Sequence, residues 1–586
     1  MRARMRLVGA VATAATAAGA LVGAAPQLAA AAGGSTEYTV LAAEGVSDAT
    51  ALAAIAQAGG TVVASNTDIG LYRVLGAADG FVALVDATPG LFGAAHRVPI
   101  GTAPQVKPML VEQEAIDAAQ AGAQAAASGT PTATTVGPTA AEVTSTAGMD
   151  PMDNLLWGLT MVKSDLARQV NAGDRRVSVG VIDTGLDASN PDLAPNFSWE
   201  LSRNFAPDIP LVDGACEVAS CLDPVGTDDG GHGTHTSGTI GAAANGSGIS
   251  GVAPNVTLVE LKGGQDSGFF FLDPVVNALT YAGNAGIDVV NMSFFVDPWL
   301  YNCVANPADT PEQQAEQRTI IAAMTRALTF AHDKGVTMFN SLGNNHEDKG
   351  NPRTDTTSPD FPPGTAHPRP IDNATCLDLP VEGPFVIGVS ALGPSTTKAD
   401  YSDYGVEQTS VSAPGGWFRD GFGTPTFRTN GNQILSTYPR KVLQQSGLVD
   451  AAGNITPAGM GLAFKACTAS GACGYYVYLQ GTSMAAPHAS GVAALIVSRF
   501  GKNDPAHQGT LRLEPWKTEA VLLNTAAEHA CPDPPLQSYV REGRSTEFNA
   551  LCVGTPEFNG FYGFGIVDAY AAVTEPPAFG HPNDNG

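Results

Sequence analysis

Val179-Gly180-Val181-Ile182-Asp183-Thr184-Gly185 is the stretch of sequence that decides the fold. An apolar run of this kind, without polar alternation, is typical of a strand that is buried on both faces of a parallel sheet. The run ends on a carboxylate followed by a tight turn. This order places Asp183 at the carboxyl edge of the sheet, where the active sites of α/β proteins lie.

Further apolar runs recur along the chain and alternate with amphipathic segments. This alternation indicates an α/β fold in which a mostly parallel sheet carries helices on both faces. The strands that we expect are Val177–Asp183, Thr257–Lys262, Val289–Ser293, Val336–Ser341 and Phe385–Ser390.

Two more segments contain side chains that can do chemistry. In Asp229–Thr239, glycines precede a small-residue helix and leave His232 at its start, with His235 three residues on. Glycines at such a place let another backbone approach closely. In Gly481–Gly491, Ser483 stands at a predicted helix start. Taken alone, the two histidines could bind a metal, and Ser483 could be a simple helix cap.

Together the three segments resemble the subtilisin-like serine peptidases, the subtilases, with Asp183, His232 and Ser483 in the family's chain order. The resemblance covers roughly residues 150–575 and is carried by further motifs. These motifs are Gly251–Pro254, Val290–Ser293, Ser341–Asn344, Ala413–Gly415 and Gly563–Ala569. The resemblance implies a subtilisin-like fold and a serine endopeptidase that hydrolyses peptide bonds through an acyl-enzyme.

The resemblance also implies a role for each site residue. Ser483 would be the nucleophile, His232 the general base, and Asp183 the group that orients the imidazole. The Ser483 backbone N–H and the Asn344 side chain would form the oxyanion hole. A strand from Lys262 to Gly268 would pair with substrate backbone at the edge of the sheet. The residues expected to bind substrate are Ser267, Gly268, Ser293, Phe294, Phe295 and Gly343.

The wall of the primary specificity pocket departs from the family pattern. After Ser293 the family usually has a bulky residue and then glycine, whereas Phe294 and Phe295 stand together here. No Asp or Glu occurs in Asn291–Phe295 or Ser341–Asn344 to pair with a cation. We therefore expect protein or peptide substrates that are cleaved after apolar or modest side chains.

Two other classes of protein fit parts of the sequence. Asp183-Thr184-Gly185 and Asp266-Ser267-Gly268 could be the paired turns of an aspartic protease, although no apolar strand precedes the second turn. A catalytically inactive subtilase relative could instead be a surface binding module. The presence of the whole triad and of the oxyanion asparagine favours the enzyme.

The composition limits the partners of the protein. Lys and Arg number 30 against 56 Asp and Glu, which gives a formal net charge of −26 and a pI near 4.6. Such a chain repels polyphosphate, so a general nucleic-acid binder is excluded. Hydrophobic residues at 44% and charged residues at 15% indicate a large buried core. We expect a monomer that binds neither nucleic acid nor a membrane.

Residues 1–32 have the three parts of a secretory signal peptide. Arg2, Arg4 and Arg6 precede an apolar run from Leu7 to about Ala25, and Ala30–Ala32 supplies the small-residue cleavage site. A membrane anchor is the alternative, but the run is short and alanine is weakly hydrophobic. We therefore expect a secreted, extracellular protein.

All eight cysteines lie after this segment. An even number in an exported chain indicates disulfides, and no C-x-x-C pair points to zinc. Nearest-neighbour pairing predicts the bonds Cys216–Cys221, Cys303–Cys376, Cys467–Cys473 and Cys531–Cys552.

The chain divides into a small unit (33–103), an Ala/Thr/Ser/Pro-rich linker (104–148), a peptidase domain (149–578) and a flexible tail (579–586). The small unit has the order βαββαβ of a ferredoxin-like fold. The strands that we expect in it are Tyr38–Ala43, Thr61–Ser65, Gly70–Leu75 and His96–Ile100. The helices that we expect are one that Ser47 caps and that runs through Ala58, and Phe81–Asp86. This unit resembles the subtilase propeptide, an intramolecular chaperone and inhibitor, and implies a proenzyme.

Structural calcium is common in subtilases. Asp192 and Asn245 stand at positions that resemble one such site. Its other ligands would be backbone carbonyls, which a sequence does not reveal. No cofactor is required for the chemistry, and no other one is implied.

Overall fold

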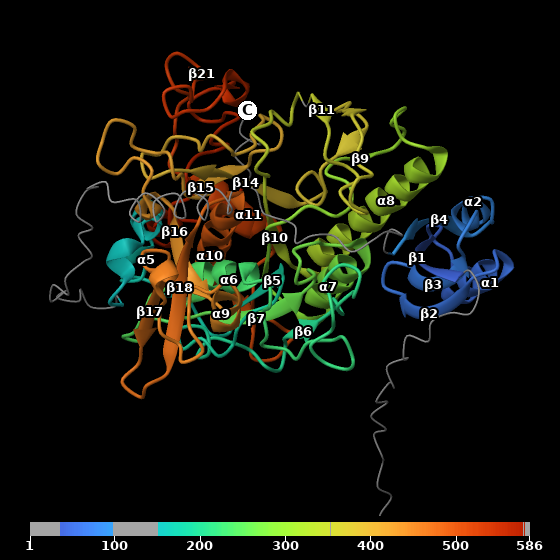
Figure 1. Ribbon diagram of the computed structural model, residues 1–586, viewed down its shortest axis with the longest axis horizontal. Coiled ribbons are helices and arrows are strands. Elements are labelled where there is room, and N and C mark those ends of the chain that lie inside the picture. The colour runs from blue at the N-terminus through green and yellow to red at the C-terminus, as the bar shows by residue number, and fades with distance from the viewer. Residues whose placement is uncertain (1–34, 98–149, 352, 578, 581–586) are drawn as a thin grey trace, which may run out of the picture.

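The computed structural model describes residues 35–97, 150–351, 353–577 and 579–580. The predicted signal peptide and linker, and residues 581–586 of the predicted tail, lie outside these residues. The described chain forms a large α/β unit with a small N-terminal unit at one side of it (Figure 1). No helix among the described residues has the length and apolar character that crossing a membrane requires.

The large unit is built on a seven-stranded sheet with the order β15-β14-β10-β8-β5-β7-β6, and every neighbouring pair is parallel. The strands are β5 (Ser178–Asp183), β6 (Arg203–Asn204), β7 (Thr257–Lys262), β8 (Val289–Met292), β10 (Thr337–Ser341), β14 (Val386–Leu392) and β15 (Val411–Pro414). The five predicted strands are confirmed, with small shifts at their ends.

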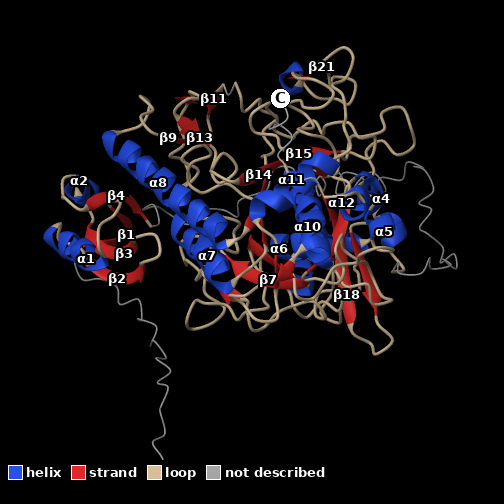
Figure 2. Cartoon of the chain, turned by 180° about the vertical axis from the view of Figure 1, so that it is seen from behind, coloured by secondary structure: helices blue, strands red, loops and turns tan. Residues whose placement is uncertain are grey.

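Helices cover both faces of this sheet (Figure 2). They are α6 (His232–Gly241), α7 (Leu272–Ala285), α8 (Pro311–Lys334), α10 (Thr482–Phe500) and α11 (Pro515–Thr525). All six residues of β5 are buried. Val179 and Val181 belong to the apolar cluster shared with α6 and α10, whereas Ile182 belongs to the cluster shared with α7 and α8. Because successive side chains of a strand point to opposite faces, β5 contributes to the apolar clusters on both faces of the sheet.

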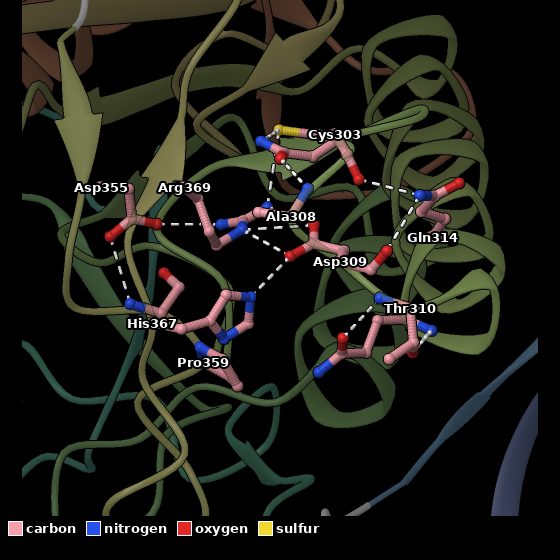
Figure 3. Close-up of polar contacts among 12 residues, drawn as sticks. Cys303, Ala308, Asp309, Thr310, Gln314, Asp355, Pro359, His367 and Arg369 are labelled. Atoms are coloured by element: carbon pink, nitrogen blue, oxygen red, sulfur yellow. Dashed lines mark hydrogen bonds and ion pairs between the residues drawn. The ribbon is translucent and has the colours of Figure 1, made fainter.

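A buried ion network organises the segment between β8 and β14. Arg369 is fully buried, and its guanidinium donates to Asp309 and Asp355, each at 2.9 Å (Figure 3). His367 contacts the same Asp309 carboxylate at 3.0 Å. Thr310, the next residue, is the N-cap of α8 and forms a capping box with Gln313. The network therefore fixes the start of α8.

The N-terminal unit is ferredoxin-like, as predicted. Its elements are β1 (Ser35–Ala42), α1 (Asp48–Gln57), β2 (Thr61–Asn66), β3 (Leu71–Ala77), α2 (Phe81–Asp86) and β4 (Leu91–His96). They form an antiparallel sheet of order β2-β3-β1-β4. Ser47 caps α1 by accepting a hydrogen bond from the Thr50 N–H, as the sequence predicts.

The last strand of this unit corrects a prediction. It is β4, so the expected strand His96–Ile100 is wrong, and residues 98–100 lie outside the described residues. The glycine and alanines of β4 have low strand propensity, which hides the strand in the sequence. A Cβ atom at Gly93 would lie 2.4 Å from the Thr319 Oγ1 of α8. Close packing against α8 therefore requires glycine at position 93.

The remaining elements are short or lie beside the main sheet. A three-stranded antiparallel sheet has the order β16-β18-β17, from β16 (Ile434–Tyr438), β17 (Ala463–Cys467) and β18 (Cys473–Leu479). The other helices are α4 (Trp157–Met161), α5 (Ser164–Ala167), α9 (Arg440–Gln445) and α12 (Ala569–Thr574). The two-residue strands are β9 (Asn302–Cys303), β11 (Thr354–Asp355), β12 (Arg369–Pro370), β13 (Cys376–Leu377), β19 (Lys502–Asn503), β20 (Leu511–Arg512), β21 (Leu536–Gln537) and β22 (Ala550–Leu551).

Four disulfides cross-link the large unit. They are Cys216–Cys221, Cys303–Cys376, Cys467–Cys473 and Cys531–Cys552, the pairs that nearest-neighbour pairing predicts.

Candidate active site

Asp183 and His232 meet where β5 ends and α6 begins. The His232 Nδ1 lies 2.8 Å from one Asp183 carboxylate oxygen and 3.0 Å from the other. The approach depends on Gly233, because a Cβ atom there would lie 2.1 Å from the Gly185 carbonyl oxygen. The close backbone contact is therefore made by the glycine after the histidine, whereas the sequence suggested the glycines before it; Cβ atoms at Gly230 and Gly231 would meet the side chains of Thr184 and Tyr438.

The Asp183 carboxylate is fully buried and held by hydrogen bonds. The Thr184 N–H donates to one oxygen at 2.8 Å, and the Thr236 hydroxyl donates to the other at 3.3 Å. A carboxylate in this position binds the Nδ1–H tautomer of a neutral imidazole, which leaves the lone pair on Nε2. His232 can thus act as a base through Nε2.

Ser483 is the second residue of α10 and is buried. Its hydroxyl donates to the Ser293 carbonyl at 3.4 Å, and the Ser293 hydroxyl donates to the Ser483 carbonyl at 3.2 Å. Asn291 Nδ2 donates to the Ser293 hydroxyl at 3.1 Å. These bonds join the start of α10 to the end of β8.

Asn344 lies beside the N-terminus of α10. Its side-chain oxygen accepts hydrogen bonds from the Thr482 N–H and the Thr482 hydroxyl, both at 2.9 Å. A Cβ atom built on Gly481 would lie 3.5 Å from Asn344 Nδ2 and 3.6 Å from the Ser483 backbone nitrogen. Both predicted oxyanion donors thus lie close to one point. Asn345 differs, because its N–H donates to the Asp403 carboxylate.

Gly343 is held by the same start of α10. Its N–H donates to the Thr482 hydroxyl at 3.1 Å, and its φ of 110° favours glycine. Thr482 and Asp403 were missed by the sequence reasoning. Thr482 adjoins the predicted nucleophile, which is a usable signal, whereas Asp403 has no local signal because only the fold brings it to Asn345.

Phe294 and Phe295 follow Ser293 but point into different apolar clusters. The Phe294 ring stacks on Phe270, with centroids 4.0 Å apart and planes 5° apart, in the cluster beneath α7. Phe295 packs at the edge of the cluster that contains Leu300. Phe294 is therefore mostly buried rather than presented to solvent.

The edge strand expected from Lys262 to Gly268 is absent. β7 ends at Lys262, and the chain then turns, with the Gly268 N–H donating to the Gln265 carbonyl. Gly268 has a φ of 85°, and the Ser267 N–H and hydroxyl both donate to Asp213. The bond within the segment and the bonds to Asp213 hold these residues in a turn, which the glycine-rich sequence allows.

The alternative readings of the motifs do not fit the geometry. His235 is fully buried, and its Nε2 lies 3.1 Å from the Ile434 carbonyl, so it is not paired with His232 around a metal. Burial lowers the pKa of His235 to about 3, which keeps it neutral. Asp183 pairs with His232 and Asp266 pairs with Lys262, unlike the shared carboxylates of an aspartic protease.

Asp192 and Asn245 lie together but do not form the expected calcium site. The Asn245 amide nitrogen donates to an Asp192 oxygen at 3.2 Å, so a donor faces the carboxylate instead of a second ligand oxygen. The other Asp192 oxygen accepts from the Ile249 N–H and the Tyr476 hydroxyl. The residues present hold this loop with hydrogen bonds, in a geometry that does not fit the ion.

Comparisons with known proteins identify relatives of the chain. The model of the subtilase family of peptidases matches residues 174–565. Subtilisin DY of Bacillus licheniformis is 26% identical over 344 residues, which is 59% of this chain and 85% of that protein. Fervidolysin of Fervidobacterium pennivorans is 27% identical over 389 residues, which is 64% of this chain and 41% of that protein.

Solved structures share the fold. The epidermin leader peptide processing serine protease of Staphylococcus aureus has a TM-score of 0.58 at 17% identity, covering 93% of this chain and 100% of that one. Fervidolysin has a TM-score of 0.53 at 21% identity, covering 93% of this chain and 61% of that one.

Proposed function

The chain belongs to the subtilase family and is a serine endopeptidase, and from this premise we propose that it is a secreted enzyme, made as a proenzyme, whose catalytic triad is Asp183, His232 and Ser483. The observation that carries the proposal is the buried Asp183–His232 pair at 2.8 Å. Its substrates are proteins or peptides. The inactive binding module is not favoured by any residue of the site.

In the proposed mechanism, the Ser483 hydroxyl attacks the carbonyl carbon of the scissile bond while His232 Nε2 takes its proton. Asp183 keeps Nδ1 protonated and stabilises the imidazolium. The negative oxygen of the tetrahedral intermediate accepts hydrogen bonds from the Ser483 N–H and Asn344 Nδ2. The convergence of these two donors beside Gly481 supports this role.

The intermediate then collapses, and His232 gives its proton to the leaving amine. The acyl group stays on Ser483 until a water molecule attacks it. His232 takes the proton of that water and returns it to the Ser483 oxygen, which frees the acid product. The hydrogen bonds from Thr482 keep Asn344 oriented toward the negative oxygen in both acylation and deacylation.

Hydrolysis of a fluorogenic peptide by the purified protein tests this proposal. Ser483→Ala should abolish turnover, and Asp183→Asn should lower kcat by about 10⁴-fold because the wrong imidazole tautomer would be favoured. Ser470→Ala, in an exposed turn, is the matched control. Full activity of the Ser483→Ala protein would refute the triad.

Peptide-library profiling tests the substrate preference. We propose cleavage after apolar or modest side chains, because the segments around Ser293 and Asn344 lack acidic residues. Predominant cleavage after Arg or Lys would contradict this preference.

The contacts of the N-terminal unit support a propeptide role. Its strand β4 packs on α8, and Asn66 donates to Asn277 and Thr280 of α7 at 2.9 and 2.8 Å. Arg326 of α8 donates to the Ala42 carbonyl at 2.9 Å. We propose that this unit assists the folding of the peptidase domain, which is slow because the domain is rich in non-local contacts. We also propose that the segment after the unit inhibits the enzyme by occupying its active-site cleft.

Processing tests the proenzyme proposal. Wild type should be secreted as a chain that begins within about residues 145–153, whereas Ser483→Ala should stay an uncleaved proform. N-terminal sequencing and intact mass distinguish the two forms. Normal trimming of Ser483→Ala in a protease-deficient host would defeat self-cleavage, and equal folding yield from a chain starting at Met149 would defeat the chaperone role.

A further inference from the structure

The turn that carries Asn344 is bonded to a single aspartate on both sides of the asparagine. The Asp403 Oδ1 accepts hydrogen bonds from the N–H groups of Asn345 and Glu347, both at 2.9 Å. The Asp403 N–H donates to the Gly343 carbonyl at 3.0 Å. The residues directly before and directly after Asn344 are therefore both held by Asp403.

The contact between Asp403 and this turn is close and dry. Asp403 is fully buried, and a Cβ atom built on Gly343 would collide with its Oδ2. Hydrogen bonds from N–H groups to an ionised carboxylate are shorter and stronger than bonds between neutral groups. The turn is therefore held more firmly than a backbone carbonyl in the same place would hold it.

A buried ammonium group fixes the Asp403 carboxylate in turn. Lys349 is fully buried, and its Nζ lies 3.2 Å from Asp403 Oδ2 and 2.5 Å from Asp378 Oδ2. The ammonium also lies over the ring of Tyr301, 5.0 Å from the centroid. Burial lowers the pKa of Lys349, but its neighbours, Asp378 foremost, raise it by more, so that the net pKa lies well above the usual value. Lys349 therefore stays charged and holds the second oxygen of Asp403.

The position of this turn matters for the chemistry proposed above. A donor stabilises an oxyanion best when it is aimed at the oxygen before the reaction begins. The bonds from Thr482 orient the Asn344 carboxamide, whereas the bonds to Asp403 place the backbone that carries it. A displacement of about 1 Å in a catalytic group can lower the rate by about a hundredfold.

We propose that Asp403, held by Lys349, is a positioning residue that sets the backbone of Asn344 for the developing oxyanion. This inference rests on the proposed function. The Asp403 carboxylate bonds to the turn and to Lys349, so its effect on the rate passes through Asn344.

Hydrolysis of a fluorogenic peptide by Asp403→Asn tests the positioning role. Whichever way the new carboxamide is turned, its NH₂ group faces either the N–H groups of the turn or the Lys349 ammonium. The value of kcat should fall about tenfold while KM stays within twofold, because the oxyanion forms only in the transition state. Asp355→Asn changes another buried carboxylate that is paired with a cation, Arg369, and as the matched control it should keep the parent's kcat.

The Asn344→Ala background distinguishes positioning from a structural defect. There Asp403→Asn should lower kcat less than twofold, because the donor that it positions is already gone. Should Asp403→Asn not fold at the assay temperature, Asp403→Ser, which is smaller and keeps one acceptor, carries the same comparison.

The inference is overturned if the folded variant keeps the parent's kcat, if only KM changes, or if the full loss persists in the Asn344→Ala background. Hydrolysis by the parent that Ser483→Ala does not abolish would instead overturn the proposed function, and this inference with it.

Discussion

Replacing Thr482 by valine would test how the proposed oxyanion hole is held in place. Thr482 is fully buried, and its hydroxyl donates to the Asn344 side-chain oxygen and accepts the Gly343 N–H. Valine keeps a similar shape and the backbone bond to Asn344, but it removes both hydroxyl bonds. The Asn344 carboxamide would then be oriented by one hydrogen bond instead of two.

The expected loss follows from the worth of one such bond. A neutral hydrogen bond contributes about 1 kcal/mol net, so transition-state stabilisation should fall by about that amount. This corresponds to about a fivefold lower kcat. KM should change little, because the oxyanion forms only in the transition state. Thr482→Ser keeps the hydroxyl and should stay close to wild type.

A double-mutant cycle with Asn344→Ala separates positioning from general damage. Steady-state kinetics on a peptide substrate should show that Thr482→Val has almost no further effect in the Asn344→Ala background, because its action passes through the missing carboxamide. An undiminished fivefold loss in both backgrounds would refute the reasoning.

Three further changes follow from the structure. Arg369→Met should destabilise the protein by about 3–5 kcal/mol, because the two carboxylates of Figure 3 would stay buried without their cation; Arg541→Met, whose side chain is exposed, is the control for denaturant unfolding. Burial lowers the pKa of His96, but the hydrogen bond to Glu316 and the charge of Glu316 raise it by more, so that the net pKa is raised. The stabilisation by His96 is therefore fully present below about pH 6.5 and is lost as the pH rises through the raised pKa. The melting temperature of the uncleaved proform should fall over this pH range, and His96→Gln should abolish that fall. Gly233→Ala should lower kcat at least tenfold in peptide hydrolysis, because its methyl group would press on the turn after β5 and separate the Asp–His pair.

The results that would contradict these expectations are distinct. Equal unfolding free energies for the Arg369 and Arg541 variants would show that the buried network is dispensable. The same pH slope in His96→Gln as in its parent would assign the titration to another group. Unchanged kcat in Gly233→Ala would mean that α6 can move away from β5 without loss.

The central strands were predictable because they are apolar over their whole length. All six residues of β5 are buried, so the sequence run and the structural environment agree. β4 was misplaced because its Gly93 is required by contact with α8, which is far away in the sequence. Local propensity contains no trace of such a contact.

The proposed catalytic residues were found in the sequence because each of them lies within a dense local motif. The segment from Lys262 to Gly268 was wrongly expected to be a strand, because it is held as a turn partly by hydrogen bonds from Ser267 to Asp213, which belongs to another loop. Hydrogen bonds between polar residues that lie far apart in the chain are the part of the site that local sequence patterns do not predict.

Labelling with a fluorophosphonate tests the central claim most directly. The mature protein should form a covalent adduct that peptide mapping locates on Ser483, and His232→Ala should slow its formation by at least a hundredfold. An adduct on another residue, or an unchanged labelling rate in His232→Ala, would contradict the proposed triad.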